Sequence, residues 1–296
     1  MFNLLDNKKK RKDVSLVLST GGARGLAHIG AIDQLESMGY NIRAVAGTSM
    51  GALVGGMYAA GRLDDFKDWM LTINRKKILS LLDFSLSISY IAKGERIINA
   101  MKKVVPDVRI EDLEIPYCAS ATDAVTGQEV TFTSGSLYEA IRASISLPLF
   151  FSPVKCKDRI LVDGGLVNPL PLNRVKRSKN DLLVAINVSG HDYRGQVEQR
   201  RIMREQQIEK SRFYSLLNRL MPEDSDMNYY TLINRSTSIM INRNVQLSLK
   251  ITPPDILVDI PMKRYDTFDF DKYERLAGIG RSKTKHAVEK FLKNNE

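Results

Sequence analysis

The residue with the clearest chemical potential is Ser49, which stands at the centre of a Gly-X-Ser-X-Gly sequence. An apolar run over 42–46 precedes this motif, and an apolar segment rich in small residues follows it over 52–60. This order predicts a strand, a sharp turn and a helix, and a serine on such a turn exposes its Oγ above the helix N-terminus. Gly47 and Gly51 are expected to let neighbouring backbone approach closely. Ser49 is therefore a candidate nucleophile for acyl transfer.

A glycine-rich loop upstream is the second chemical feature. The segment 14–19 reads as a buried strand, residues 26–38 show helical spacing of apolar side chains, and Gly39 is a plausible helix stop. The loop between them can direct backbone N–H groups at an anion. A dinucleotide fingerprint is disfavoured because Thr20 occupies its first glycine position, and the Gly-Lys-Ser/Thr of a phosphate loop is absent. An oxyanion hole beside Ser49 fits better, since consecutive strands of this kind usually lie close together.

The third feature is Asp163, which ends a short apolar strand predicted over 159–162. A carboxylate at a strand end can serve as a general base, and Gly164 and Gly165 would allow other backbone to approach it. Taken alone, Asp-Gly-Gly is also a common turn sequence.

Together these motifs resemble those of the patatin-like phospholipase family. The matching segments are Gly21-Gly22-Ala23-Arg24-Gly25 for the oxyanion loop, Gly47-Thr48-Ser49-Met50-Gly51 for the nucleophile elbow and Asp163-Gly164-Gly165 for the Asp-Gly-Gly/Ala motif. The segments 143–148 and 168–171 are similar to family segments as well, and the resemblance covers residues 13–190. Thr20 stands where the family usually has a further glycine, which leaves the set of oxyanion donors open.

The resemblance implies both a fold and a mechanism. The fold is a three-layer α/β/α sandwich with a mostly parallel central sheet. The activity is hydrolysis of lipid acyl esters, by a phospholipase A, a lysophospholipase or a general esterase, without a metal ion or cofactor. Ser49 would attack the carbonyl and Asp163 would take its proton directly, while Gly21 shapes the loop whose amides, from Gly22 to Gly25, hold the oxyanion. Burial would have to raise the pKa of Asp163 above its ordinary value near 3.9 for this role.

Two alternatives remain open. The order Ser49, Asp163, His191 is that of nucleophile, acid and base in α/β-hydrolases, and His191 follows a strand predicted over 181–188. Against this triad, Ser49 comes after only about two strands, which is early for that fold. His28 is expected to pack or cap the first helix, and His286 to lie on the surface. The other alternative is a lipid-binding or regulatory protein without turnover, against which the intact Ser49 and Asp163 argue.

Composition favours a globular enzyme. The chain has 296 residues, 43% of them hydrophobic, and a formal net charge of +10. We expect a mobile basic arm over 1–12, ending in Lys8-Lys9-Lys10-Arg11-Lys12, and one domain over 13–296. No membrane-spanning run, signal peptide or nucleic-acid module is recognisable, so a cytoplasmic protein is expected, with the basic charge directed to anionic lipid on the inner face of the membrane. Cys118 and Cys156 are predicted to be two buried free thiols.

Further elements follow from local patterns. A helix with Asp64 as its N-cap is predicted over 64–74, a hairpin around 125–127, and a capping box at Ser136. The portion from about 195 is predicted to be helical, with amphipathic helices over 196–218 and 229–251 that either mediate homodimerisation or cover the sheet. The segment 76–92 is either ordinary core or a flap over the site.

Overall fold

A mixed β-sheet forms the centre of the computed structural model, which describes residues 12–81, 90–190, 229–261, 265 and 268–295. The strands lie in the order β10-β9-β1-β2-β4-β8-β7, and β5 pairs with β4 outside this path. Their bounds are β1 Lys12–Leu18, β2 Tyr40–Thr48, β4 Tyr117–Asp123, β5 Glu129–Phe132, β7 Val154–Cys156, β8 Arg159–Asp163, β9 Leu182–Asn187 and β10 Ile256–Asp259. A second sheet pairs β3 (Tyr90–Ala92) with β6 (Leu149–Phe151).

Most of the central sheet is parallel. The strands β10, β9, β1, β2 and β4 run parallel to one another, whereas β5 and β8 are antiparallel to β4 and β7 is antiparallel to β8. Leu18, at the end of β1, lies opposite Gly47 in β2. The glycine loop that follows β1 and the turn that follows β2 therefore leave the sheet at the same edge.

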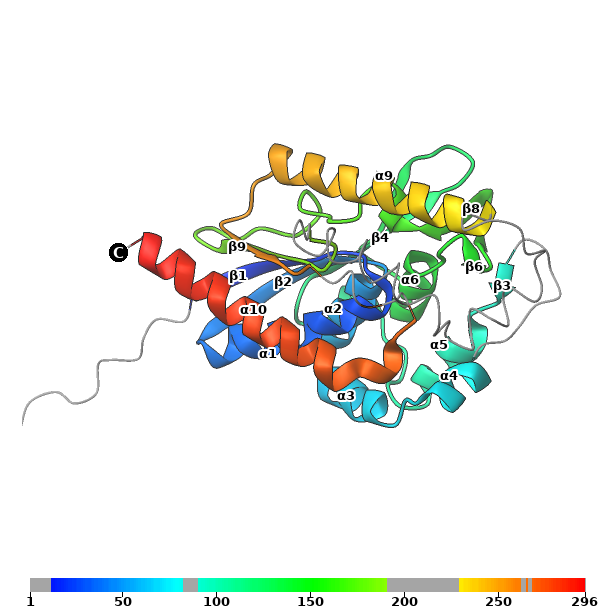
Figure 1. Ribbon diagram of the computed structural model, residues 1–296, viewed down its shortest axis with the longest axis horizontal. Helices are drawn as coiled ribbons and strands as arrows, with labels where there is room; N and C mark the ends of the chain where they lie inside the picture. The colour runs from blue at the N-terminus through cyan, green and yellow to red at the C-terminus, as the bar shows by residue number, and fades with distance from the viewer. Residues whose placement is uncertain (1–11, 82–89, 191–228, 262–264, 266–267, 296) are drawn as a thin grey trace, which may run out of the picture.

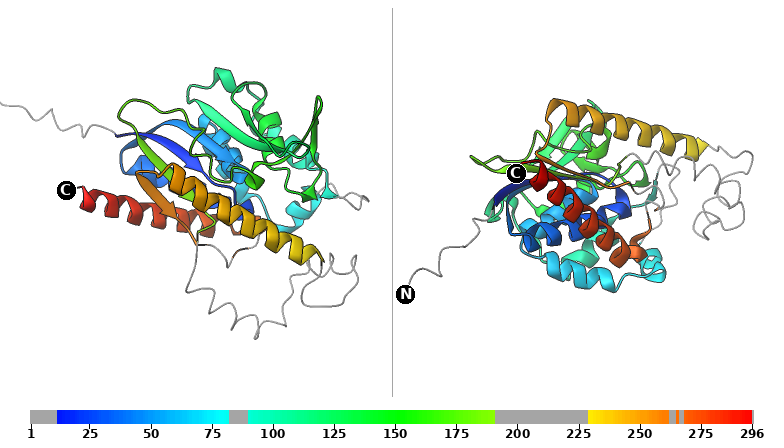
Figure 2. Two further views of the ribbon diagram at one scale, coloured as in Figure 1. Left: turned by 90° about the horizontal axis from the view of Figure 1, so that it is seen from above. Right: turned by 60° about the vertical axis from the view of Figure 1, so that its left-hand side comes forward.

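Helices cover both faces of the sheet (Figures 1 and 2). The α-helices are α1 Ala27–Ser37, α2 Met50–Ala59, α3 Leu63–Leu71, α4 Arg75–Leu81, α5 Glu95–Lys102, α6 Leu137–Ser144, α9 Tyr229–Ile251 and α10 Tyr273–Asn294, and the 3-10 turns are η1 Gly22–Leu26, η2 Ile110–Asp112, η3 Gly164–Leu166 and η4 Phe270–Lys272. In Figure 1, α9 lies above the sheet, and α1, α3 and α10 lie below it. None of the helices in the described ranges combines the length and hydrophobicity that crossing a bilayer requires.

The alternation of side chains along β1 explains the two covered faces. Leu16 and Leu18 belong to the large core that includes α1 and α2, while Val17 belongs to a second core with Val245 of α9. Successive residues of a strand point to opposite faces, so a sheet with both faces apolar needs a layer on each side. The predicted three-layer α/β/α sandwich with a mostly parallel sheet is confirmed.

Several local predictions are confirmed. The hairpin joins β4 to β5, Ser136 caps α6 by accepting from the N–H of Glu139, and α9 covers Tyr229–Ile251. The C-terminal portion differs from the helical prediction, because β10 adds a parallel strand to the edge of the sheet between α9 and α10. The predicted helix over 196–218 lies outside the described residues, as do residues 1–11 of the arm predicted over 1–12 and residues 82–89 of the segment 76–92. Lys12, the last residue of the predicted arm, is instead the first residue of β1.

Two local predictions are wrong. Helix α3 begins at Leu63 with Arg62 at the N-cap, so Asp64 lies inside the first turn, where a carboxylate still interacts favourably with the helix dipole. Cys118 is buried as expected, but Cys156 is exposed. Among the described residues its strand, β7, is the last of the sheet and pairs with β8 on one side only.

The C-terminal helix is fastened to the first helix by two glycines. A Cβ added to Gly30 of α1 would lie 1.8 Å from the carbonyl oxygen of Ala277, and one added to Gly280 of α10 would lie 1.9 Å from that of Ala27. The two backbones therefore touch where α1 and α10 cross, and no larger residue fits. Since η1 leads directly into α1, this crossing also supports the glycine loop.

We expect Gly280→Ala to lower the free energy of unfolding by about 1–3 kcal/mol, the usual cost of forcing an extra methyl group into a packed interface. Urea unfolding followed by circular dichroism measures the change. Gly278→Ala is the matched control in the same helix, because nothing lies within 4 Å of its added Cβ. It should raise stability by roughly 0.5–1 kcal/mol through helix propensity. Equal effects of the two substitutions would contradict the proposed close contact.

Candidate active site

Ser49 occupies a strained turn between β2 and α2. Its φ is 56° and its ψ is −122°, a combination that L-residues rarely adopt. Two glycines make the turn fit: a Cβ on Gly47 would lie 2.3 Å from the carbonyl oxygen of Gly51, and a Cβ on Gly51 would lie 2.3 Å from that of Leu18. Such a backbone costs about 1–3 kcal/mol, and it persists only where the surroundings enforce it. The predicted strand, turn and helix around Ser49 are present.

Two consecutive hydrogen bonds through Ser144 hold the backbone of the turn. The N–H of Ser49 donates to Oγ of Ser144 over 2.8 Å, and that hydroxyl donates to the carbonyl oxygen of Ser120 over 2.6 Å. Ser144 is the last residue of α6 and Ser120 lies in β4. The backbone of Ser49 is thereby connected to the neighbouring strand, and its side chain remains available for chemistry.

The glycine loop packs directly against this turn. Gly22 has a φ of 56°, and Gly22–Leu26 form the single 3-10 turn η1. A Cβ on Gly25 would lie 2.5 Å from Cβ of Met50, the residue that follows Ser49. The side chain of Arg24 folds back, so that its Nε donates to the carbonyl oxygen of Gly21 over 3.0 Å. The first N–H groups of a helical turn have no partner within it, so this loop offers donors next to Ser49.

Asp163 ends β8 and is almost fully buried, with 2% of its surface exposed. Its Oδ1 accepts from the N–H of Gly165 over 2.7 Å. Its backbone N–H donates to the carbonyl oxygen of Ser146 over 3.0 Å, and its carbonyl oxygen accepts from Oγ1 of Thr122 over 3.0 Å. A Cβ on Gly164 would lie 2.2 Å from the carbonyl oxygen of Ser120, so a glycine is required beside the carboxylate.

Thr20 connects the loop to the aspartate. Its N–H donates to the carbonyl oxygen of Pro169 over 2.9 Å, and its Oγ1 lies 3.1 Å from the position that a Cβ on Gly165 would take. Thr20, which stands where the family usually has a glycine, therefore fits by packing closely against the turn that follows Asp163. The three motifs recognised in the sequence converge on one site.

Burial dominates the electrostatics of Asp163 and raises its pKa from 3.8 to about 6. The Ser49 side chain and then the Gly165 N–H partly offset this rise in pKa, so the hydroxyl lies within reach of the carboxyl group. No well-formed hydrogen bond joins them, however, and Oδ2 of Asp163 is buried without a partner among the described residues. A carboxylate oxygen in this state is poised to accept a proton from a hydroxyl that approaches it.

The histidines differ in their position and burial. His28 is fully buried in α1, its Nε2 donates to the carbonyl oxygen of Ser19 over 2.9 Å, and burial lowers its pKa to about 4. It is therefore a neutral packing residue that ties α1 to the end of β1, as expected. His286 is exposed on α10, also as expected. His191 lies outside the described residues.

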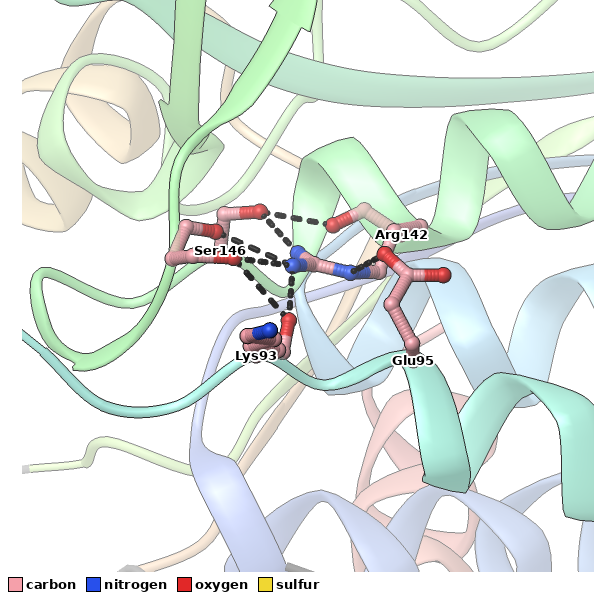
Figure 3. A network of polar contacts seen from close by, with 5 residues as sticks. Lys93, Glu95, Arg142 and Ser146 are labelled. Carbon is pink, nitrogen blue, oxygen red and sulfur yellow. Dashed lines mark hydrogen bonds and ion pairs between the residues drawn. The ribbon is translucent and has the colours of Figure 1, made fainter. Parts of the chain in front are cut away.

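Arg142 and Ser146 form a network of polar contacts that the sequence did not reveal (Figure 3). Arg142 of α6 has 7% of its side chain exposed, and its guanidinium pairs with Glu95 over 3.3 Å. It also donates to Oγ of Ser146 over 2.6 Å, to the carbonyl oxygen of Ser152 over 3.1 Å and to that of Lys93. Since the carbonyl oxygen of Ser146 holds the Asp163 N–H, Arg142 fixes the loop on which the aspartate rests.

A second network lies around Glu129. Its Oε1 accepts from Nδ2 of Asn168 and from Oγ of Ser120, each over 2.8 Å, and its Oε2 accepts two bonds from Arg174. The carbonyl oxygen of Asn168 accepts from Oγ1 of Thr48 over 2.7 Å. The residue before Ser49 is thus joined to the segment that follows Asp163, which fixes the spacing of the two motifs.

Comparison with known proteins identifies the family. A profile described as patatin-like phospholipase matches residues 16–175, more than half of the chain. The chain belongs to the patatin-like phospholipase family. All three motifs of the candidate site lie within the matched range.

Two relatives and one solved structure illustrate what this patatin-like chain is similar to. An uncharacterized NTE family protein of Mycobacterium tuberculosis (strain H37Rv) is 46% identical over 179 residues, which are 60% of this chain and 50% of the relative. Lysophospholipase NTE1 of Candida glabrata is 30% identical over 277 residues, 90% of this chain and 15% of the relative. The chain thus spans about half or less of the length of these curated relatives. The crystal structure of VipD from Legionella pneumophila covers 95% of this chain, with 67% of its own chain aligned, at a TM-score of 0.45 and 14% identity.

Asp163→Asn is expected to stabilise the fold at alkaline pH. The raised pKa makes the charged carboxylate costly in the folded state. This cost is absent below about pH 4, where the group is protonated whether or not the chain is folded, and it is complete above about pH 6. The free energy of unfolding of the variant should exceed that of the wild type by about 2–3 kcal/mol near pH 8, with no difference near pH 3.5.

Urea unfolding at the two pH values measures this effect. Asp123→Asn is a control of opposite sign, because the Val125 N–H lowers the pKa of Asp123. It should lose stability at alkaline pH. If Asp163→Asn were less stable than the wild type at both pH values, the buried carboxylate would not be destabilising.

Arg142→Gln is expected to disturb the aspartate through its supporting loop. The substitution leaves buried acceptors of Lys93 and Ser152 with fewer donors, at a cost of about 1–3 kcal/mol in the free energy of unfolding. We expect kcat/KM on a short soluble ester to fall at least about tenfold, as misplacement by an ångström commonly causes. Arg109→Gln is the control, because its ion pair with Glu111 is exposed and should contribute little to stability. Equal activity of the two variants would contradict the positioning role of Arg142.

Proposed function

We propose that this protein is a serine-dependent hydrolase of lipid acyl esters, acting as a phospholipase A, a lysophospholipase or a general esterase. The observation that carries the proposal is the meeting of a strained Ser49, a glycine loop beside it and a buried Asp163 with an unpartnered carboxylate oxygen. Family membership supports a lipid acyl ester as the substrate, as does the similarity to the lysophospholipase of Candida glabrata.

In the proposed mechanism Ser49 and Asp163 form a dyad. Oγ of Ser49 attacks the ester carbonyl carbon while its proton passes to Oδ2 of Asp163, giving a tetrahedral intermediate with a negative oxygen. The carbon–oxygen bond to the alcohol then breaks, and Asp163 returns the proton to the leaving alcohol. Water then attacks the carbonyl carbon of the acyl-enzyme while Asp163 takes its proton. Asp163 passes this proton to Oγ of Ser49 as the bond to the acyl group breaks, which releases the fatty acid and restores Ser49.

Two properties of the site make a dyad feasible. Burial raises the pKa of Asp163 to about 6, which brings its basicity closer to that needed while leaving it ionised at neutral pH. The remaining gap to a serine hydroxyl is large, so stabilisation of the oxyanion must supply much of the rate. The amides of Gly22, Ala23, Arg24 and Gly25 are the proposed donors, and Gly21 shapes the loop, since a Cβ there would lie 2.3 Å from Val188.

The remaining proposals concern partners and location. We infer a cytoplasmic protein that meets its substrate at an anionic membrane surface, to which the basic segment 8–12 would be drawn by about 1 kcal/mol per residue. Residues 8–11 of this segment lie outside the described residues, and Lys12 begins β1. Homodimerisation is likewise proposed, on the basis of the amphipathic helices predicted over 196–218 and 229–251.

A set of alanine and asparagine variants distinguishes dyad from triad. Ser49→Ala and Asp163→Asn should each lose hydrolysis of a nitrophenyl ester almost completely, because each removes a group that the reaction requires. His191→Ala should stay within about tenfold of the wild type, a barrier change near 1.4 kcal/mol. A loss of several orders of magnitude in a folded His191→Ala variant would favour the triad, and full activity of Ser49→Ala would end the proposal.

Gly22→Ala tests the loop. The φ of 56° is strained for alanine, so the substitution should turn the loop amides away and lower kcat by roughly 10²–10³, the scale for losing one oxyanion donor. Gly61→Ala is the matched control, because its φ of +65° imposes the same strain with nothing within 4 Å of the added Cβ. It should lose stability but not activity. Similar kcat values for the two variants would exclude this loop as the oxyanion hole.

A further inference from the structure

Helix α9 carries an unusual outer surface. Five large apolar residues of this one helix are between 42% and 79% exposed: Leu232, Ile239, Met240, Leu247 and Ile251. Successive members of this set are seven, one, seven and four residues apart, which places all five on one side of a helix. Val245, which is 1% exposed, and Leu249 pack on the opposite side against the sheet. The helix is therefore apolar on its outer face as well as on its inner one.

The charges on α9 are all of one sign. The helix contains Arg235, Arg243 and Lys250 and no acidic residue. Arg243 and Lys250 are exposed, and helical spacing places both among the exposed apolar residues. Neither of these two forms an ion pair with another residue in the part of the chain that the structure describes. An exposed face that combines apolar and basic side chains is typical of helices that lie in a membrane interface.

The position of α9 links this surface to the candidate active site. Nδ2 of Asn244 donates to the carbonyl oxygen of Leu166 over 2.9 Å, and Leu166 ends η3, the turn that follows Asp163. Both figures show α9 as an outer layer of the molecule, on the side of the sheet opposite α10 (Figures 1 and 2). A lipid surface that contacts α9 would thus meet the protein close to the segment that carries the proposed base.

We propose that the outer face of α9, formed by the five exposed apolar residues with Arg243 and Lys250, is the surface by which this protein docks on an anionic phospholipid bilayer. The apolar side chains enter the boundary between head groups and acyl chains, and the basic groups reach the phosphates. A second copy of this chain is a poorer occupant, because a twofold contact would set the basic residues of two identical helices against each other. The docking proposal rests on the proposed function for its biological sense, but its test does not depend on turnover.

The test is sedimentation of full-length protein with vesicles, in a Ser49→Ala background so that lipids stay intact. Vesicles of mixed phosphatidylcholine and phosphatidylglycerol are compared with pure phosphatidylcholine at low and high salt. Ile239→Ser with Met240→Ser should lower partition onto the anionic vesicles at least about tenfold through lost apolar contact. Arg243→Gln with Lys250→Gln should lower it about 10- to 30-fold and reduce its dependence on salt.

Two matched controls report on other surfaces. Leu71→Ser removes an apolar residue of α3 that is 59% exposed, and Lys283→Gln with Lys290→Gln removes two exposed charges of α10. Both should bind vesicles like the parent. Circular dichroism and urea unfolding establish that every variant is folded, and in the Ser49 form the α9 variants should hydrolyse a soluble ester at the wild-type rate.

Three results would overturn the proposal: equal partition of the α9 variants and the parent, equal losses in the controls, or a dimeric parent that becomes monomeric on α9 substitution. The last would identify the face as an interface between copies. Absence of ester hydrolysis by the wild type would instead end the proposed function, and the vesicle result would stand by itself.

Discussion

The contact between the turn at Ser49 and the end of β1 determines the geometry of the whole site. Gly51 lies so close to the carbonyl oxygen of Leu18 that a single added carbon would clash at 2.3 Å. This contact enforces the positive φ of Ser49 and places the next residue, Met50, against Gly25 of the loop. The proposed nucleophile and the proposed oxyanion donors are thus brought together by the packing of two parallel strands.

The carboxylate is positioned by a different principle. Asp163 ends β8, which is antiparallel to β4. Hydrogen bonds hold its backbone and its Oδ1, while its Oδ2 is buried without a partner among the described residues. Burial raises the pKa of Asp163, so the charged carboxylate lowers the stability of the fold at neutral pH. Such a cost is common at active sites, where a raised pKa suits a carboxylate that acts as a base. The Arg142 network resists relaxation of the loop beneath it, because Arg142, Ser146 and Asp163 form one continuous chain of hydrogen bonds.

Much of the fold and the three motifs could be predicted because their determinants are local. Ser49, Gly22 and Asp163 each stand at or just beyond the end of an apolar strand and beside glycines, and the helix over 229–251 follows from its periodicity, although the amphipathic prediction missed the apolar side chains on its outer face. The supporting residues could not be predicted, since Ser144 acts on Ser49 across 95 positions and Arg142 acts on Lys93 across 49. The exposure of Cys156 was missed for a similar reason: only the order of strands, which sequence does not give, places β7 at an edge.

The central claim is that Asp163 itself removes the proton from Ser49. The most direct measurement is the pH dependence of the rate at which a fluorophosphonate modifies Ser49, with the modified residue located by mass spectrometry. The account predicts that the rate rises through an apparent pKa near 6, in line with the value that burial gives Asp163. It also predicts that this dependence survives in His191→Ala and that Asp163→Asn abolishes the modification. A rate that disappears in a folded His191→Ala variant, or one that Asp163→Asn leaves unchanged, would contradict it.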